Sequence, residues 1–161
     1  MTLFWLLPSA VVLHIGEEFI YPGGFRPWYQ KYNPSIASSL TNRFLVTING
    51  ILIAVCILPI LIGISPQAIS LWLTVVAILF SNSLFHITAT IKSRRYSPGI
   101  ITSVILYLPL SVWGYWFFVS THQASFGTAM VSFILGSSYQ WWSLSNHRRR
   151  SKAQKGPDAA V

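Results

Sequence analysis

The chain has 161 residues, of which 53% are hydrophobic and only 9% are charged, and its formal net charge is +8. Because soluble domains carry about 25% charged residues, this composition excludes an ordinary soluble fold and favours a chain solvated by lipid. The positive charge does not indicate nucleic acid as a partner, since the 11 Lys and Arg fall in three clusters between or after apolar runs. The single cysteine, Cys56, excludes a disulfide framework.

Five segments are long and apolar enough to cross a bilayer as helices, which takes about 20 residues. In chain order they are Leu3 to Tyr21, Phe44 to Ile64, Gln67 to Ile91, Ile100 to Ser120 and Ala124 to Leu144. No Lys or Arg precedes the first segment, so we interpret it as a retained span and not as a signal peptide. The predicted fold class is therefore all-α, a polytopic membrane helix bundle of about five transmembrane helices over residues 1–146. The basic remainder, residues 147–161, is expected to form a disordered cytoplasmic tail.

The loops between the predicted spans carry charge on one side only. The loops after the first and third spans and the C-terminal tail are basic, whereas the loops after the second and fourth spans contain no Lys or Arg. The positive-inside rule makes the basic side cytoplasmic. We therefore expect an integral, multi-pass protein with an external N-terminus and a cytoplasmic C-terminus, whose main partner is the lipid membrane.

Two of the three acidic residues, Glu17 and Glu18, are adjacent inside the first predicted span, and His14 lies one turn before them. At about 100° per residue, the three side chains share one arc of the helix. A carboxylate at membrane depth costs about 3 kcal/mol on insertion scales, and two neighbouring carboxylates repel each other. A proton, a cation or a metal must therefore compensate them.

The remaining strongly polar residues of the spans lie at one depth, near the predicted cytoplasmic side. Counting along each helix from its cytoplasmic end places them level with the acidic pair: Asn49, Asn82, His86, Thr102 and Gln140. Scattered polar residues would not gather in one layer. We therefore predict one site, in which Asn82, Asn49 and Gln140 support the ligands from behind.

The side chains expected to hold a metal are His14, Glu17, Glu18 and His86. Two imidazoles and two carboxylates suit a divalent metal such as Zn²⁺, Fe²⁺ or Mn²⁺. Two other interpretations stay open: an internal polar network that joins the helices, and a site that handles protons or cations without a bound metal. The network is disfavoured because no Lys or Arg lies at that depth to pair with the acids.

The residues Tyr-Ser-Pro-Gly at positions 96–99 precede the fourth span. The simple interpretation is a turn with proline near the first helical position. The functional alternative is that the helix N-terminus binds an anionic group, such as a lipid phosphate or carboxylate. In that case the substrate-binding residues would be Tyr96, Pro98, Gly99 and Thr102.

Three motifs together resemble a known family. They are His-Ile-Gly-Glu-Glu at residues 14–18, the later His86, and Tyr-Ser-Pro-Gly at residues 96–99. Their order and membrane placement are similar to the H-x-x-E-E domain family of small membrane proteins, which is named for the first motif and carries a further histidine and a Y-x-P-G motif. The resemblance extends to about Leu144, and it strengthens the site more than any particular function.

We therefore expect a metal-dependent membrane enzyme that acts on a lipid or other hydrophobic substrate near the cytoplasmic leaflet. In a hydrolytic version, His14, His86 and one glutamate hold the metal, and the other glutamate is the general base, so Glu17 and Glu18 are the catalytic residues. In an oxidative version the same ligands hold iron. The alternatives are a metal, ion or proton permease and a non-catalytic membrane interaction subunit. The apolar outer half of the spans disfavours a permease.

Overall fold

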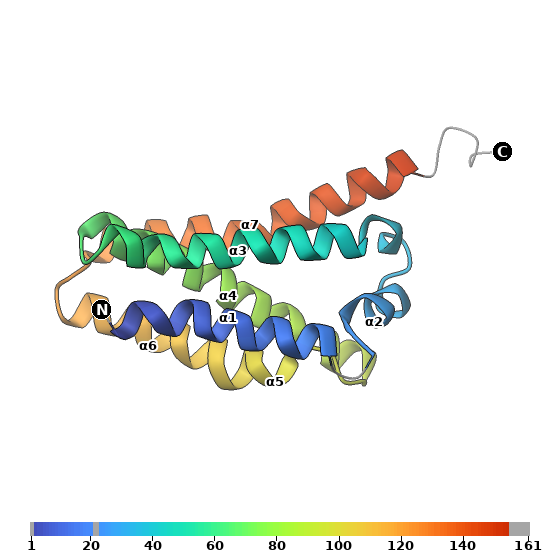
Figure 1. Ribbon diagram of the computed structural model, residues 1–161, viewed down its shortest axis with the longest axis horizontal. Coiled ribbons are helices and arrows are strands. Elements are labelled where there is room, and N and C mark those ends of the chain that lie inside the picture. The colour runs from blue at the N-terminus through green and yellow to red at the C-terminus, as the bar shows by residue number, and fades with distance from the viewer. Residues whose placement is uncertain (1, 21–22, 155–161) are drawn as a thin grey trace.

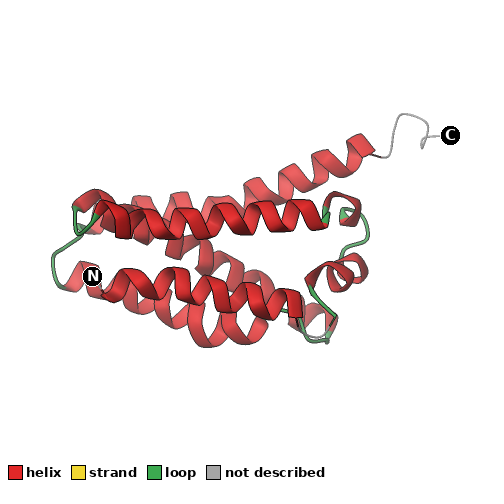
Figure 2. Cartoon of the chain, in the orientation of Figure 1, coloured by secondary structure: helices red, strands yellow, loops and turns green. Residues whose placement is uncertain are grey.

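The computed structural model describes residues 2–20 and 23–154, and the described chain is helical with no strand (Figure 2). The main helices run lengthwise in one bundle (Figure 1). In chain order the elements are α1 (Thr2–Ile20), α2 (Phe25–Tyr32), a 3-10 turn η1 (Ala37–Ser39), α3 (Asn42–Ile62), α4 (Pro66–Ser93), α5 (Ile100–Thr102), a π-helical segment η2 (Ser103–Tyr107), α6 (Leu108–Ser120) and α7 (Phe126–Gln154). The all-α prediction is confirmed.

Four helical stretches are long and apolar enough to cross a membrane: α1, α3, α4 and the continuous stretch Ile100–Ser120, which joins α5, η2 and α6. They match the first four predicted spans, with boundaries that agree to within one turn. Large apolar side chains face outward from them, including Ile20, Leu61 and Val112. The chain is therefore a multi-pass membrane protein.

Helix α7 covers the fifth predicted span and continues beyond it. We expected the chain to lose regular structure at His147, but the helix extends to Gln154. The reason is tertiary contact: His147 and Ser151 are both buried, and they hydrogen-bond to Ser39 and Ser38 around η1. The rest of the predicted tail, residues 155–161, lies outside the described residues.

Local sequence explains where the long helices begin. Thr41 caps α3 by accepting a hydrogen bond from the Phe44 amide at 3.1 Å, and Ser65 caps α4 by accepting one from the Ala68 amide at 3.2 Å. Pro66 follows Ser65 at the first helical position, where its missing amide has no consequence. Caps of this kind contribute about 1 kcal/mol each.

A proline also explains the π-helical segment. Pro109 near the start of α6 cannot donate a backbone hydrogen bond, and its ring crowds the carbonyl one turn before it. The backbone widens into π-helical geometry over Ser103–Tyr107, directly before this proline. The fourth span therefore changes its helical phase between Thr102 and α6.

Helix α4 is the centre of the bundle, because α3, α6 and α7 all pack against it. Its close approach to α7 depends on Gly136, where an added Cβ would lie 2.2 Å from the Thr74 carbonyl oxygen. The main apolar core surrounds the fully buried Trp72 on α4, with Leu7 of α1 and Phe118 of α6.

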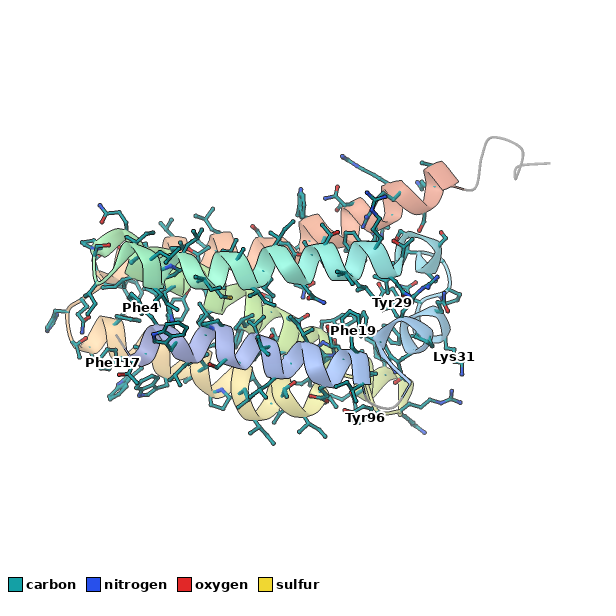
Figure 3. The ribbon with its side chains drawn as sticks, in the orientation of Figure 1. Phe4, Phe19, Tyr29, Lys31, Tyr96 and Phe117 are labelled. Atoms are coloured by element: carbon teal, nitrogen blue, oxygen red, sulfur yellow. The ribbon has the colours of Figure 1, made fainter. Side chains whose placement is uncertain are left out.

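The two ends of the bundle differ in chemistry. Figure 3 shows Phe4 and Phe117 at the end where α1 begins, and Tyr29, Lys31 and Tyr96 at the opposite end. The start of α3 and the ends of α4 and α7 also lie at this second end (Figure 1). All Lys and Arg of the described residues therefore gather at one end of the molecule. That this end faces the cytoplasm remains a prediction.

Candidate metal centre

Three of the four predicted ligands meet in the interior of the bundle. His14 and Glu18 lie one turn apart on α1, and His86 reaches them from α4. Glu18 Oε1 lies 3.4 Å from His14 Nε2 and 3.4 Å from His86 Nε2. The exposed fractions of His14, Glu18 and His86 are 3%, 8% and 0%. Their ligand atoms all lie within 4.8 Å of one another.

This geometry fits the dimensions of a metal site. Two ligand atoms that each bind one ion at about 2.1 Å with tetrahedral angles lie about 3.4 Å apart. Both separations between an imidazole Nε2 and the Glu18 oxygen have this value. Two imidazoles with one carboxylate are also the ligand set of several catalytic zinc sites and of non-haem iron sites. The residues present therefore fit a divalent metal.

The hydrogen bonds of His14 favour a tautomer with the proton on Nδ1. Thr102 has a single hydroxyl proton, which it donates to Glu17 Oε2 at 2.5 Å. The 2.8 Å contact between Thr102 Oγ1 and His14 Nδ1 must then be donated by His14. In this tautomer Nε2 bears a lone pair, which accepts from the Asn82 amide at 3.1 Å and lies 3.4 Å from the Glu18 carboxylate. A cation bound between Nε2 and Glu18 would bring the two acceptors together.

His86 is held from the side opposite to Glu18. Its Nδ1 lies 3.0 Å from the Ser97 hydroxyl, which can donate or accept. Its Nε2 is buried without a hydrogen-bond partner among the described residues. The ring also contacts His14 edge to face, with centroids 5.1 Å apart. These contacts leave Nε2 of His86 directed at Glu18 Oε1, 3.4 Å away.

Glu17 lies apart from this group, although we expected it to share the metal. Its carboxylate accepts the backbone amides of Ile101 at 3.0 Å and Thr102 at 2.8 Å, together with the hydroxyls of Thr102 and Tyr96. These amides belong to the first turn of the fourth span, where helix N-termini favour negative charge. Glu17 therefore fastens α1 to the start of α5.

The Tyr-Ser-Pro-Gly segment packs directly against the His-x-x-Glu-Glu residues. Tyr96 donates to Glu17, Ser97 contacts His86, and Pro98 is buried. The anion that we expected at this helix N-terminus as part of a substrate is supplied here by Glu17. The two motifs consequently form one unit, in which the second motif positions the residues of the first.

Gly99 lies against both imidazole rings. A Cβ built at this position would be 2.7 Å from Cε1 of His14 and 2.7 Å from Cε1 of His86. Its φ of +99° is also a conformation that side-chain-bearing residues rarely adopt. Only glycine fits here, and its absence of a side chain allows the two rings to approach each other.

Of the three amide side chains predicted to support the ligands, two are hydrogen-bonded in a chain that leads to His14 and one is not. The Asn82 amide donates to His14 Nε2 at 3.1 Å, and the Gln140 amide donates to the Asn82 carbonyl at 3.5 Å. Asn49 Nδ2 is buried without a hydrogen-bond partner among the described residues. All three side chains line one cavity, together with His14 and Glu18.

This cavity has a volume of about 700 Å³, is partly open to the surroundings, and is lined by residues of α1, α2, α3, α4 and α7. Most of its lining is apolar, and the polar side chains of His14, Glu18 and the three amides interrupt it. His86 is not part of the lining. A small molecule in the cavity would therefore reach the centre from the side of His14 and Glu18.

Sequence analysis missed three residues around this site. Ser97 lies inside the Tyr-Ser-Pro-Gly motif, so its position was a signal for a role. The Tyr107 ring contacts His14 with centroids 4.4 Å apart, and no pattern in the sequence marked it. His147 was expected to be solvated, but it is buried and lines the cavity.

Comparison with known proteins gives one family and one short match. A short segment is 36% identical over 56 residues to Protein NRT1/PTR FAMILY 2.6 of Arabidopsis thaliana. This segment is 35% of the chain and 9% of that protein, so the chain spans about a tenth of that relative's length. No solved structure matches.

The family comparison covers the site. The HXXEE family, described as proteins of unknown function with an HXXEE motif, matches residues 5–114. This range contains His14, Glu17, Glu18, His86 and the segment 96–99, all of which the structure brings into contact. It also covers more than half of the chain. The chain therefore belongs to the HXXEE family.

Proposed function

We propose that the protein is a metal-dependent membrane enzyme that acts on a hydrophobic substrate bound in the cavity beside His14 and Glu18. The observation that carries this proposal is the set of two imidazoles and one carboxylate with 3.4 Å separations, buried at the wall of an apolar cavity. A structural network would need Nε2 of His14 or His86 to donate to Glu18, whereas a metal site needs a lone pair on both nitrogens.

In this proposal His14, His86 and Glu18 hold a divalent ion through Nε2, Nε2 and a carboxylate oxygen. Such an ion would polarise a water or a substrate oxygen bound beside it. The Asn82 amide must turn away from His14 Nε2 when the metal binds, because one lone pair cannot serve both. Asn82 and Gln140 then face the cavity and can orient a polar group of the substrate.

Glu17 has a positioning role in this proposal and is not the general base. Its carboxylate already accepts two backbone amides and two hydroxyls. Through Thr102 it holds the His14 proton on Nδ1 and so keeps Nε2 available. A carboxylate behind a ligating histidine is the usual arrangement in zinc sites, and here a threonine hydroxyl lies between the two.

The shape of the cavity favours an enzyme over a permease. A path through the membrane needs polar side chains on both halves. The cavity instead ends among apolar side chains on the side away from the basic end, at Val55 and Phe133. A substrate that enters it therefore stops beside the centre and does not pass through.

The adjacent glutamates offer a matched test by elemental analysis of the detergent-purified protein. Glu18→Gln removes a metal ligand and should lower bound metal from about one ion per chain to a small residual fraction. Glu17→Gln should retain most of the metal. It should, however, lower the free energy of unfolding by about 1–3 kcal/mol, because charge-assisted hydrogen bonds to the helix N-terminus become neutral ones.

Two outcomes would contradict the proposal. If wild-type protein holds no metal and Glu18→Gln lowers the melting temperature, Glu18 is part of a structural network. If Glu17→Gln loses the metal while Glu18→Gln keeps it, the ligands are assigned to the wrong glutamate. A melting curve for each variant shows whether a loss of metal is merely a loss of fold.

A further inference from the structure

The residues that line the cavity beside the centre extend along two helices. The cavity is lined along one face of α3 from Phe44 to Val55 and along one face of α7 from Phe133 to His147. At 1.5 Å per residue these faces measure about 16 Å and about 21 Å. An extended hydrocarbon chain advances about 1.2 Å per bond, so the cavity matches a single chain of about 13–17 bonds.

The two ends of the cavity differ in polarity. The end near Val55 and Phe133 is apolar. The opposite end holds His147, whose Nδ1 lies 2.6 Å from Ser39 Oγ and 3.3 Å from a guanidinium nitrogen of Arg150. Arg150 also lies over the Phe44 ring, 4.0 Å from its centroid, and Phe44 is itself part of the cavity lining.

The cations at this end have no acidic partner in the described chain. Arg150 Nε is buried without a hydrogen-bond partner among the described residues. The sequence has three acidic residues, and Glu17 and Glu18 are bound at the centre, while Asp158 lies outside the described residues. Arg150 is half-exposed and lies beside the lining residues Phe44 and His147, outside the lining itself. A carboxylate bound at this end of the cavity would supply the acceptor that the buried Nε of Arg150 lacks.

We propose that the cavity binds a single-chain carboxylic acid, with its carboxylate at Arg150 and His147 and its chain extending past Glu18 towards Val55. Gln140, beside Asn82, lies seven residues before His147, which is about 10 Å along α7. The centre therefore faces the chain about eight bonds from the carboxylate. That this acid is a substrate rests on the proposed function, whereas its binding does not require the metal.

A single chain fits better than a two-chain phospholipid. The cavity volume of about 700 Å³ lies within the range of about 300–1,000 Å³ that is usual for one small ligand. The lining faces of α3 and α7 border one cavity with one apolar end. A second acyl chain would have to remain outside in the bilayer.

Equilibrium binding of radiolabelled palmitic acid to the protein in phosphatidylcholine nanodiscs tests the proposal, with and without prior EDTA treatment. Palmitic acid should bind at least about tenfold more tightly than its methyl ester, because the ester lacks the charge that pairs with Arg150. Octanoic acid should bind at least about tenfold more weakly than palmitic acid, since it fills only half of the cavity.

Two pairs of neighbouring residues supply matched variants. Ser137 lines the cavity and Ser138 does not, so Ser137→Trp should abolish binding and Ser138→Trp should not. Arg150→Ala should remove the preference for the acid over the ester, while the exposed Arg149 should be replaceable by alanine without effect. Leu52→Trp fills the cavity from the α3 side and replaces Ser137→Trp in the test if that variant fails to fold.

Each outcome is decisive. Equal binding of the acid and the ester, or an unchanged preference in Arg150→Ala, overturns the assignment of the carboxylate. If palmitic acid still binds to both Ser137→Trp and Leu52→Trp, or if phospholipid binds in place of palmitic acid, the proposal that the cavity holds a single-chain carboxylic acid is wrong. If the protein as purified, before any EDTA treatment, holds no metal but binds palmitic acid, the proposed function fails and this inference stands.

Discussion

Glu17 and Glu18 contact different helices because successive side chains on α1 point about 100° apart. Glu18 turns towards α4 and meets both histidines, whereas Glu17 turns towards the start of α5. The sequence placed both on one arc with His14, which was sufficient to predict a site. It did not reveal which glutamate faces which helix, since that depends on where the fourth span packs.

Gly99 gives a prediction at the scale of one residue. Gly99→Ala places a Cβ 2.7 Å from carbon atoms of both imidazole rings, in backbone with positive φ. Gly63 also has a positive φ of +79°, but an added Cβ there meets nothing within 4 Å. Its ψ of −176° is a conformation that essentially only glycine adopts, so Gly63→Ala should destabilise the protein by about 1–3 kcal/mol from backbone strain alone.

Gly99→Ala should destabilise the protein by about 1–3 kcal/mol through crowding of the two rings, in addition to the backbone strain at its own positive φ. It should also reduce bound metal, while Gly63→Ala should not. Thermal melts and elemental analysis of the two variants measure both effects. Metal retained in Gly99→Ala without destabilisation beyond backbone strain would show that the two rings are not held against this glycine.

Hydropathy predicted the elements well where lipid determines them. The first four spans follow from apolar length, and in the structure Thr41 and Ser65 cap the starts of α3 and α4. Composition did not predict the end of α7, because Arg148, Arg149 and their neighbours are typical of a solvated, disordered tail. Contact with η1 keeps this segment helical, and single-sequence patterns carry no information on such contacts.

The contact between α7 and η1 predicts a pH dependence. Burial, together with the neighbouring Arg150, lowers the pKa of His147 from 6.5 to about 4. Between about pH 6.5 and pH 4 the unfolded chain takes up a proton at this histidine that the folded chain does not. The contribution of His147 to stability is therefore complete above this window and is lost as the pH falls through it.

Melting temperatures measured from pH 7 to pH 4 should accordingly fall less steeply in His147→Gln than in the wild type. His122→Gln is the control, because His122 is exposed in the loop between α6 and α7. Titration of the other groups is common to all three proteins. Parallel curves for His147→Gln and the wild type would mean that the end of α7 does not keep this histidine neutral.

At the scale of the whole molecule, the polar residues form one layer near the basic end, and the cavity crosses that layer. The sequence predicted the layer, because depth follows from position along each span. It did not predict the cavity, which exists because α3 and α7 both pack on α4 and leave the space between their facing sides open. Open space of this kind depends on how helices diverge, and residue composition does not specify it.

The central claim is that Glu18 and the two histidines hold one metal ion. X-ray absorption at the metal edge of protein purified from membranes tests it most directly. We expect about one ion per chain with nitrogen and oxygen neighbours at about 2.0–2.2 Å and the outer scattering of two imidazoles. In His86→Ala this scattering should fall to that of one imidazole or vanish with the metal. A wild-type protein without stoichiometric metal, or a spectrum that His86→Ala leaves unchanged, would contradict the claim.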